Sequence, residues 1–359
     1  MKIDYIITGM DVGGAEMQVV ELLLELKKRG HFVRLISLTP PVDLIDKLIR
    51  SKIPVVSLGI KSKLSLPLAA FKLAILIRKH SPNIVHAHMF HANILIRLVS
   101  AFFQSSIPVI CTTHSVCEEA KFRKWLYRMT NKLCDLNTTV SDAARQRYIN
   151  EKVFPTEKTL TVYNCINTDR FSIIEKQSSK RFCWITVGRL VKIKNQRLIL
   201  QAMLELPNSD LIIIGEGDER LSLQTFIKEN FLTERVTLLG KKDNPVDYYH
   251  NADAFVLTSN AEGFALVVAE AMACGLPVVA THCGGPSEII GDGQNFGITI
   301  SINDVHQLTV AMQQIESLDF EQRKGNSYRA REKVIEKFSV QKIVSQWENI
   351  YLRIQKNRN

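Results

Sequence analysis

Two glutamates eight positions apart, Glu262 and Glu270, are the residues of this sequence best placed to do chemistry. Glu262 lies where an apolar run, 254–257, gives way through small residues to an Ala- and Val-rich segment that ends at Gly275. This pattern predicts a buried parallel strand, a turn and a helix, with Glu262 on the connecting loop. Because ligands of open α/β sheets bind at such loops, we expect Glu262 to face a ligand.

The residues that follow Glu262 are expected to bind an anion through their backbone. Amides in the first turn of a helix have no intrahelical partner, and the positive end of the helix dipole favours a phosphate. These amides belong to Gly263, Phe264, Ala265 and Leu266. Glu270, further along the helix, can accept two hydrogen bonds from a vicinal diol such as a ribose, so the layout suits a nucleotide-sugar. An alternative stays open, in which Glu262 caps the helix and Glu270 is a solvated surface carboxylate.

A second loop carries two cations suited to the same ligand. Arg189 and Lys194 follow Gly188 at the end of an expected strand, 182–187, and precede an expected helix. Arginine offers a planar fork of donors and lysine a compact charge, and both stay protonated beside phosphate. We expect Arg189 and Lys194 to point inward and grip a pyrophosphate, with Lys192 turned outward.

Glycines and histidines of the first half could add to this chemistry. Gly13 and Gly14 open the first expected helix, where backbone can approach a phosphate closely, although a tight turn explains them better when they are taken alone. We expect His86 and His88 to point to opposite faces of a strand, without the further ligands of a metal site. His114, at a strand tip, is placed to hydrogen-bond a sugar hydroxyl or move a proton, or it is an ordinary loop histidine.

The elements that position these residues alternate between strand and helix along the whole chain. Strands are expected at 3–7, 32–38, 55–58, 84–87, 109–113, 136–139, 182–187, 211–214, 236–239, 254–257 and 277–281. Helical patterns separate them, which predicts two Rossmann-like, doubly wound parallel sheets. We expect a first domain over 1–168 and a second over 169–339, with a polar linker at 175–181. A final helix within 340–359 is expected to pack back on the first domain.

Composition restricts the class of protein. The 359 residues are 46% hydrophobic, enough for two cores. The seven cysteines are scattered without CxxC spacing, which indicates neither disulfides nor zinc and favours the cytoplasm. No signal peptide and no membrane-spanning run is recognised. Residues 1–169 hold 23 Lys and Arg against 14 Asp and Glu, and thus most of the net charge of +10, so an anionic partner is expected there.

Two segments of the basic half mix apolar and basic side chains at helical spacing, 66–79 and 118–129. Basic amphipathic helices can lie in an anionic membrane interface, which would make the protein peripheral on the inner face of the cytoplasmic membrane. The alternative is that the apolar stripes are core faces, and we prefer it for 66–79. No nucleic-acid-binding motif is recognised.

The order and spacing of these motifs resemble the retaining glycosyltransferases of family 4, which have the GT-B fold of two such domains facing a central cleft. The resemblance spans almost the whole chain. It rests on Gly13-Gly14-Ala15-Glu16, Val140-Ser141, Val162 to Asn167, Gly188-Arg189 with Lys194, Gly215-Glu216-Gly217, and Glu262 to Glu270. Three residues depart from the family pattern: Cys165 and Asn167 in the hinge motif, and Asn195 after Lys194. Cys165 is expected to alter the hinge, because cysteine tolerates positive φ poorly.

The resemblance implies a function. It assigns the donor diphosphate to Arg189 and Lys194, the donor hexose to Glu262, the ribose to Glu270, and a place facing the donor sugar to His114. It implies a hexose moved from a nucleotide-diphosphate sugar, UDP-linked by preference, to a glycan or lipid-linked acceptor bound by the first domain, in cell-surface polysaccharide or lipopolysaccharide assembly. No D-x-D motif is present, so neither a metal nor another cofactor is expected. The alternatives are a nucleotide-sugar epimerase on the same fold and a non-catalytic carbohydrate-binding scaffold.

Overall fold

The computed structural model describes residues 1–11, 13–40, 45–62, 65–103, 106–116, 120–174, 181–291 and 296–357. Its backbone contacts divide the chain into two compact units. Unit 1 comprises Met1–Cys165 and Val340–Asn359, and unit 2 comprises Ile166–Ser339. The division falls three residues before the boundary expected at 168/169. Most of the expected linker, 175–180, lies outside the described residues.

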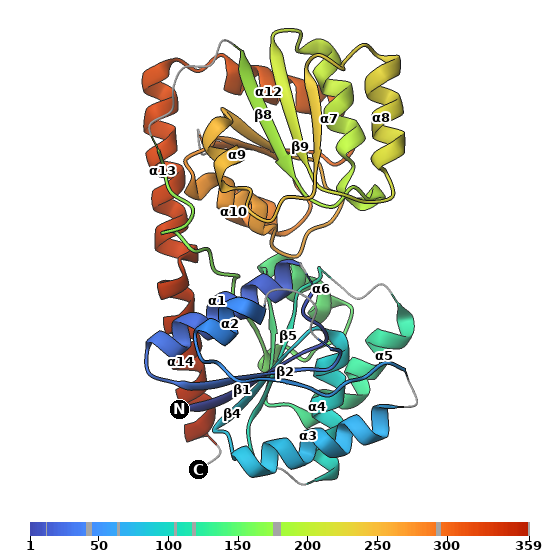
Figure 1. The fold of residues 1–359 in the computed structure, drawn as a ribbon, viewed down its shortest axis with the longest axis vertical. Coiled ribbons are helices and arrows are strands. Elements are labelled where there is room, and N and C mark those ends of the chain that lie inside the picture. Colours follow the sequence, from blue (N-terminus) through green and yellow to red (C-terminus); the bar gives the residue numbers. More distant parts are fainter. Residues whose placement is uncertain are drawn as a thin grey trace. The chain divides into compact units, whose positions relative to one another are not determined.

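Unit 1 is built on a seven-stranded sheet in which every pairing is parallel, in the order β3-β2-β1-β4-β5-β6-β7 (Figure 1). The strands are β1 (Lys2–Ile7), β2 (Phe32–Ser37), β3 (Val55–Ser57), β4 (Ile84–His88), β5 (Val109–Thr113), β6 (Leu136–Thr139) and β7 (Thr159–Thr161). The helices are α1 (Gly14–Lys28), α2 (Ile45–Arg50), α3 (Leu66–His80), α4 (Phe90–Phe102), α5 (Lys121–Thr130), α6 (Asp142–Asn150) and α14 (Val340–Lys356). Of the helix that the sequence pattern predicts over 43–50, residues 43 and 44 lie outside the described residues.

Two apolar layers cover the faces of this sheet. One joins β1 to α1 and to α14, whose Ile343, Trp347 and Tyr351 are buried there. The other joins the sheet to α3 and α4 through residues such as Leu73 and Ile96. The last helix of the chain therefore completes the core of the first unit.

The chain leaves unit 1 at Cys165, whose surroundings differ from the expected altered hinge. Cys165 is not among the residues with positive φ, so its backbone requires no glycine. The side chain of Gln18 holds it, because Gln18 Nε2 donates to the Cys165 sulfur at 2.7 Å and Gln18 Oε1 accepts from the Cys165 amide at 2.8 Å. The next residue, Ile166, pairs with Ser339, so the two crossings of the chain lie side by side.

Unit 2 contains a six-stranded parallel sheet in the order β10-β9-β8-β11-β12-β13. The strands are β8 (Phe182–Val187), β9 (Ser209–Ile214), β10 (Val236–Gly240), β11 (Ala254–Leu257), β12 (Val278–Thr281) and β13 (Gly297–Ile300). The helices are α7 (Gln196–Ala202), α8 (Arg220–Glu229), α9 (Val246–Asn251), α10 (Leu266–Ala273), α11 (Gly285–Ile290), α12 (Val305–Glu316) and α13 (Phe320–Phe338). The strand order reverses between β8 and β11, and this is where ligands bind in doubly wound sheets.

Candidate active site

The loops after β8 and β11 lie next to each other because these two strands are paired in the sheet. The β8 loop carries Arg189 and Lys194, and the β11 loop carries Glu262. Backbone contacts join the loops: the amide of Asn260 donates to the carbonyl of Ile193 at 2.7 Å, and the hydroxyl of Thr258 donates to the carbonyl of Asn195 at 2.8 Å. The sheet order thus brings together residues that are far apart in the sequence.

Lys194 and Glu262 form an ion pair at the centre of this site. Lys194 Nζ donates to Glu262 Oε1, which also accepts from the hydroxyl of Ser259 at 2.6 Å. The two ionic side chains keep 19% and 11% of their surface exposed, so the pair is partly shielded from water but open to a ligand. The alternative that Glu262 caps the following helix is wrong, because the N-cap of α10 is Ala265 and no side chain makes a capping hydrogen bond there.

The start of α10 shows how the chain presents backbone N–H groups. Ala265 adopts a left-handed conformation with φ 68° and leads into Leu266, the first residue of the helix. Phe264 is buried, and its ring packs edge-on against Phe338 with centroids 5.4 Å apart. Gly285 lies so close to Phe264 that a Cβ there would overlap the Phe264 backbone. Close packing therefore fixes the turn from Gly263 to Leu266, whose first-turn amides can bind an anion.

Glu270 lies inside unit 2 and is not a surface residue. Only 6% of it is exposed, and its Oε2 accepts a hydrogen bond from the Tyr249 hydroxyl at 3.1 Å. Burial, together with the nearby Glu270 carboxylate, raises the pKa of Tyr249 well above its ordinary value. The alternative of a solvated carboxylate is therefore wrong, since Glu270 is an oriented, buried acceptor.

Arg189 is exposed, as is Lys192, whereas Lys194 is half-buried. The carbonyl of Arg189 accepts from Gln196 Nε2 at 2.9 Å, which fixes the loop while leaving the guanidinium at the surface. The tight turn after β9 supports this loop: the amide of Leu190 donates to the carbonyl of Glu216 at 2.8 Å. A Cβ at Gly215, whose φ is +150°, would overlap the carbonyl of Gly188, so the close approach requires glycine.

The remaining predicted residues belong to unit 1. Gly13 is the N-cap of α1 in an extended conformation, with φ −148°, and Gly14 is the first helical residue. A Cβ on Gly13 would overlap the Glu16 carboxylate, so the glycine makes room for that side chain. The amides at the start of this long helix are suited to an anion, like those of α10.

His114 follows β5 and pairs with His88, whose Nδ1 lies 3.0 Å from His114 Nε2. The rings of His86 and His88 are only 4.2 Å apart, so the expectation that they point to opposite faces is wrong. Residues two apart in a strand share a face. His86 is instead held by the hydroxyls of Tyr351 and Thr112, at 2.8 and 2.7 Å.

Burial lowers the pKa of His114 to about 4 and the pKa of His88 well below its usual range. Both rings are therefore neutral at pH 7, and in their mutual hydrogen bond one donates while the other accepts. Within the described part of the chain, His114 Nδ1 and His88 Nε2 are buried without a hydrogen-bond partner. One of these two nitrogens carries a proton and the other a lone pair, so His114 keeps a buried nitrogen whose hydrogen-bonding capacity is not used within the described part of the chain.

Sequence reasoning missed three supports of the site. Ser259 orients Glu262, Tyr249 orients Glu270, and Gly285 allows the approach of Phe264. Of these three residues, only Ser259 could have been found from the sequence, because it lies three residues before Glu262 on the same loop. No cluster of three or more metal-ligating side chains occurs among the residues that the structure describes. In the same residues, no helix combines the length and apolarity needed to cross a bilayer.

Known structures share this architecture. A glycosyltransferase from Rickettsia africae superimposes with a TM-score of 0.87 at 20% identity, and the match covers 99% of both chains. Anabaena Alr3699/HepE, in complex with UDP, gives a TM-score of 0.84 at 21% identity over 98% of this chain and 99% of that one. The chain therefore has the GT-B fold expected from the sequence.

Sequence comparison gives the family. Residues 12–170 match the model for Glycosyltransferase Family 4, and residues 168–333 match that for Glycosyl transferases group 1. An N-acetyl-alpha-D-glucosaminyl L-malate synthase from Bacillus anthracis is 30% identical over 371 residues, covering 96% of each chain. A Campylobacter jejuni N-acetylgalactosaminyltransferase that acts on a diphospho-undecaprenol acceptor is 28% identical, covering 94% of this chain and 97% of that one. This chain belongs to the family 4 glycosyltransferases.

Proposed function

We propose that this protein is a retaining, metal-independent glycosyltransferase that moves a hexose from a UDP-sugar to a glycan or lipid-linked acceptor. The Lys194–Glu262 pair at the strand-order reversal of unit 2, beside Arg189 and the start of α10, carries this proposal. The arrangement places cations and helix amides where a diphosphate needs neutralising and a carboxylate where a sugar offers hydroxyls.

Each of these residues is assigned to one part of the donor according to the charge that it supplies. Arg189, Lys194 and the amides from Gly263 to Leu266 neutralise the diphosphate, first in the bound donor and then as it departs. Glu270 accepts from the ribose hydroxyls, and Tyr249 keeps its carboxylate oriented. A UDP donor is supported by the UDP and UDP-glucose complexes of Alr3699/HepE.

Transfer is proposed to occur on the face of the sugar that the diphosphate leaves. The anomeric C–O bond to the phosphate breaks, the acceptor oxygen bonds to the same carbon, and the acceptor proton passes to the departing phosphate oxygen. Glu262 holds the hexose hydroxyls during this exchange, and Lys194 compensates the charge that develops on the phosphate. Gly13, Gly14 and His114 are assigned to the donor from unit 1, with His114 neutral and able to hydrogen-bond the sugar.

The acceptor is proposed to be lipid-linked and part of cell-surface polysaccharide or lipopolysaccharide assembly, which places the enzyme on the cytoplasmic face of a membrane. Relatives support this choice. One from Escherichia coli is described as a UDP-Gal:alpha-D-GlcNAc-diphosphoundecaprenol alpha-1,3-galactosyltransferase, and one from Staphylococcus aureus acts in capsular polysaccharide biosynthesis. Unit 1, which carries most of the basic excess, is proposed to bind this acceptor.

A donor panel tests the proposal. The purified chain is incubated with UDP- and GDP-hexoses and prenyl diphosphate-sugar acceptors, and the anomeric coupling constant of the product is measured by NMR. We expect UDP release that depends on acceptor, survives EDTA and gives the donor's own anomeric configuration. An inverted product would refute the same-face step, an epimerised donor without acceptor would favour the epimerase, and sugar binding without any turnover would favour the scaffold.

A further inference from the structure

Helices α3 and α5 of unit 1 each carry a second apolar stripe that faces solvent. On α3, Leu68, Phe71 and Ile75 are about half exposed, at 57%, 54% and 49%, while Leu73 and Ile77 on the other side are buried. Spacing of three and four residues places the three exposed side chains on one face. A helix at the surface of a globular protein needs one apolar stripe, so the second one has no role in the fold.

Helix α5 repeats this arrangement. Phe122, Trp125 and Met129 are 65%, 50% and 64% exposed, again at spacings of three and four residues. The rings of Phe122 and Trp125 stack with centroids 5.9 Å apart, so they form one apolar surface. The core side of the helix is supplied by Tyr127, which is fully buried. The preference for reading 66–79 as a core face alone is therefore incomplete, because α3 has both kinds of stripe.

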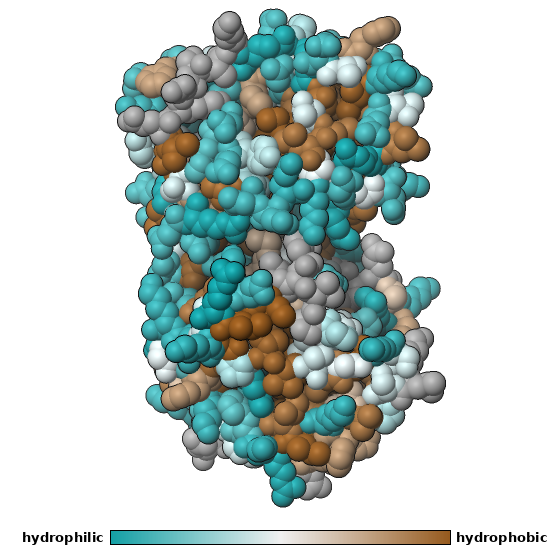
Figure 2. All heavy atoms as spheres, in the orientation of Figure 1, coloured by the Kyte–Doolittle hydropathy of each residue, from teal (hydrophilic) through white to brown (hydrophobic). Residues whose placement is uncertain are grey.

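The end of α4 extends the exposed stripe of α3. Phe102 and Phe103 are 81% and 52% exposed, and the Phe103 ring lies 6.5 Å from that of Phe71 on α3. Helix α4 packs against both α3 and α5. Figure 2 shows apolar side chains gathered at the surface around α3. We call the outward stripes of these helices, together with their exposed basic residues, the α3–α5 face.

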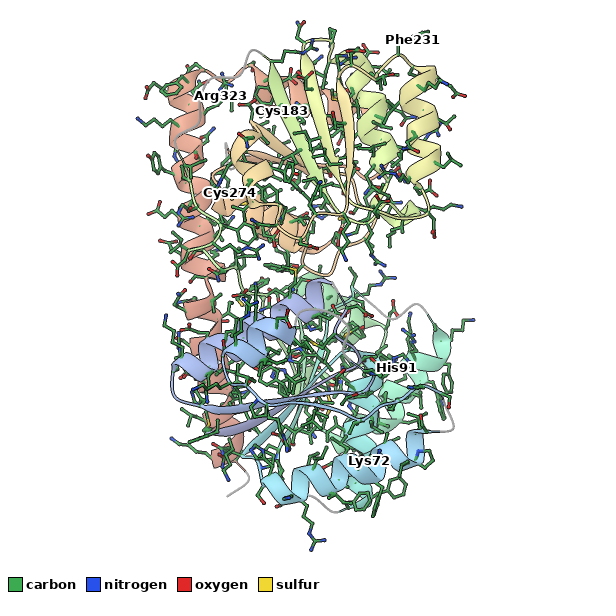
Figure 3. All side chains as sticks on the ribbon, viewed as in Figure 1. Lys72, His91, Cys183, Phe231, Cys274 and Arg323 are labelled. Atoms are coloured by element: carbon green, nitrogen blue, oxygen red, sulfur yellow. The ribbon has the colours of Figure 1, made fainter. Side chains whose placement is uncertain are left out.

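The α3–α5 face is basic and contains no acid. Helices α3, α4 and α5 include no Asp or Glu, and neither does any position from 51 to 117. The exposed charges on these helices are Lys72, Arg78 and Lys79 on α3 (Lys72 is labelled in Figure 3) and Lys121 and Arg128 on α5. Acids do occur nearby, since Lys124 of α5 is paired with Glu151 and Glu118 and Glu119 precede α5 in the sequence, but the exposed charges on these three helices are all cations. Large exposed aromatics beside exposed cations are the composition that binds an anionic membrane interface.

We propose that the α3–α5 face docks the protein onto an anionic lipid bilayer, with Phe122 and Trp125 entering the headgroup region. A bilayer fits better than a second copy of the chain, because two such faces would oppose like charges across a symmetric interface. The docking itself depends only on these side chains. Its purpose, holding unit 1 at a lipid-linked acceptor, rests on the proposed function.

The positions of the three tryptophans allow lipid binding by α5 to be followed by tryptophan fluorescence. Trp184 and Trp347 are 0% and 2% exposed, so Trp125 is the one tryptophan whose surroundings a lipid can change. We expect its fluorescence to shift to shorter wavelength with vesicles containing about one third phosphatidylglycerol and to be quenched by brominated lipid chains. Phosphatidylcholine vesicles should bind the chain at least about tenfold more weakly, because the cations gain about fivefold each from an anionic surface.

Sedimentation with the same vesicles tests the assignment in the full chain. We expect Phe122→Ser with Trp125→Ser, and separately Lys72→Glu with Lys121→Glu, to lower the partition coefficient at least about tenfold. Phe231→Ser is the matched control, since Phe231 is a 90% exposed aromatic of unit 2 and its loss should change nothing. All changed residues are exposed, and unaltered circular dichroism would confirm that the variants fold.

Three results would overturn docking: unchanged vesicle binding by both double variants, no shift of the Trp125 emission, or a dimer on gel filtration that either double variant dissolves. Stronger binding to single-stranded DNA than to the vesicles would assign the face to nucleic acid instead. UDP binding, followed by thermal shift, separates this inference from the proposed function. A chain that binds vesicles but no UDP would refute the proposed function and leave membrane docking standing. A chain that binds UDP but no vesicles would refute membrane docking and leave the proposed function standing.

Discussion

Glu262 competes with a donor phosphate for Lys194, and replacing it by glutamine should therefore separate binding from turnover. In the ligand-free site the ammonium of Lys194 is paired with Glu262, so a diphosphate must take over that cation. Glu262→Gln removes the negative charge but keeps an oxygen that can still accept from Ser259. UDP should therefore bind at least as well as before, whereas transfer of the sugar should be slowed.

The expected gain in affinity follows from the exposure of the pair. Two unit charges about 4 Å apart attract by about 4 kcal/mol at an effective dielectric constant of about 20. Partial exposure of both side chains reduces this, and pairs open to solvent are typically worth about 0.2–1 kcal/mol. Release of Lys194 should then strengthen UDP binding by up to about fivefold. Lys194→Ala should have the opposite effect and weaken it by about tenfold or more, because a hydrogen bond to a charged group contributes about 1.5–3 kcal/mol.

Isothermal titration with UDP measures the affinities, and initial rates with a UDP-sugar measure the turnover. Ser259→Ala is the matched control, since it removes the hydroxyl beside Glu262 and leaves both charges. In the double variant Glu262→Gln with Lys194→Ala, the gain in UDP affinity that Glu262→Gln alone produces should vanish. If Glu262→Gln weakened UDP binding as much as Lys194→Ala does, the competition between carboxylate and phosphate would be refuted.

Three further outcomes follow from the geometry. Tyr249→Phe removes one hydrogen bond that orients the Glu270 carboxylate, so the preference for UDP over 2′-deoxy-UDP should shrink two- to fivefold (about 1 kcal/mol or less) in competition binding. Because burial lowers the pKa of His114 to about 4 while an unfolded histidine titrates near 6.5, unfolded chains bind more protons between these values. His114 alone should then cost unit 1 up to about 3 kcal/mol in urea unfolding as the pH falls through this window, and His114→Gln should make the slope shallower without abolishing it, since the pKa of His88 is lowered as well. Gly285→Ala should lower stability by about 2 kcal/mol or more and abolish UDP binding, whereas Gly188→Ala, which meets no atom within 4 Å, should unfold like the parent chain.

Buried parallel strands were the most predictable part of the fold. The largely apolar runs at 182–187 and 254–257 match β8 and β11 to the residue, because buried parallel strands are nearly continuously apolar. The sequence did not reveal α13. Its buried side chains are only Asn326, Ala330, Val334 and Phe338, a narrow stripe in an otherwise polar helix. The three-residue strand β7, Thr159–Thr161, is too short to give a periodicity.

The residues of the site were easier to find than their partners. Arg189, Lys194 and Glu262 could be identified because each is a charged residue on a loop that follows a buried strand. The order of the strands in the sheet then places these two loops side by side. The direct pairing of Lys194 with Glu262 could not be foreseen, since the residues are 68 positions apart and each alone suits the ligand. Burial of Glu270 escaped prediction for a related reason, because a hydroxyl that donates to its carboxylate belongs to Tyr249, on another helix.

The position of α14 in unit 1 affects how the protein is made on the ribosome. Residues 340–356 are translated after all of unit 2, yet Trp347 and Tyr351 belong to the core beside β1. At about 5–20 residues per second, roughly 10–40 s separate the completion of residues 1–165 from the arrival of this helix. During that interval the nascent chain presents an open apolar groove along α1 and β1, while residues 166–339 can already fold. Chaperone engagement is therefore expected at the earlier half of the polypeptide, and its release should coincide with the emergence of the last helix.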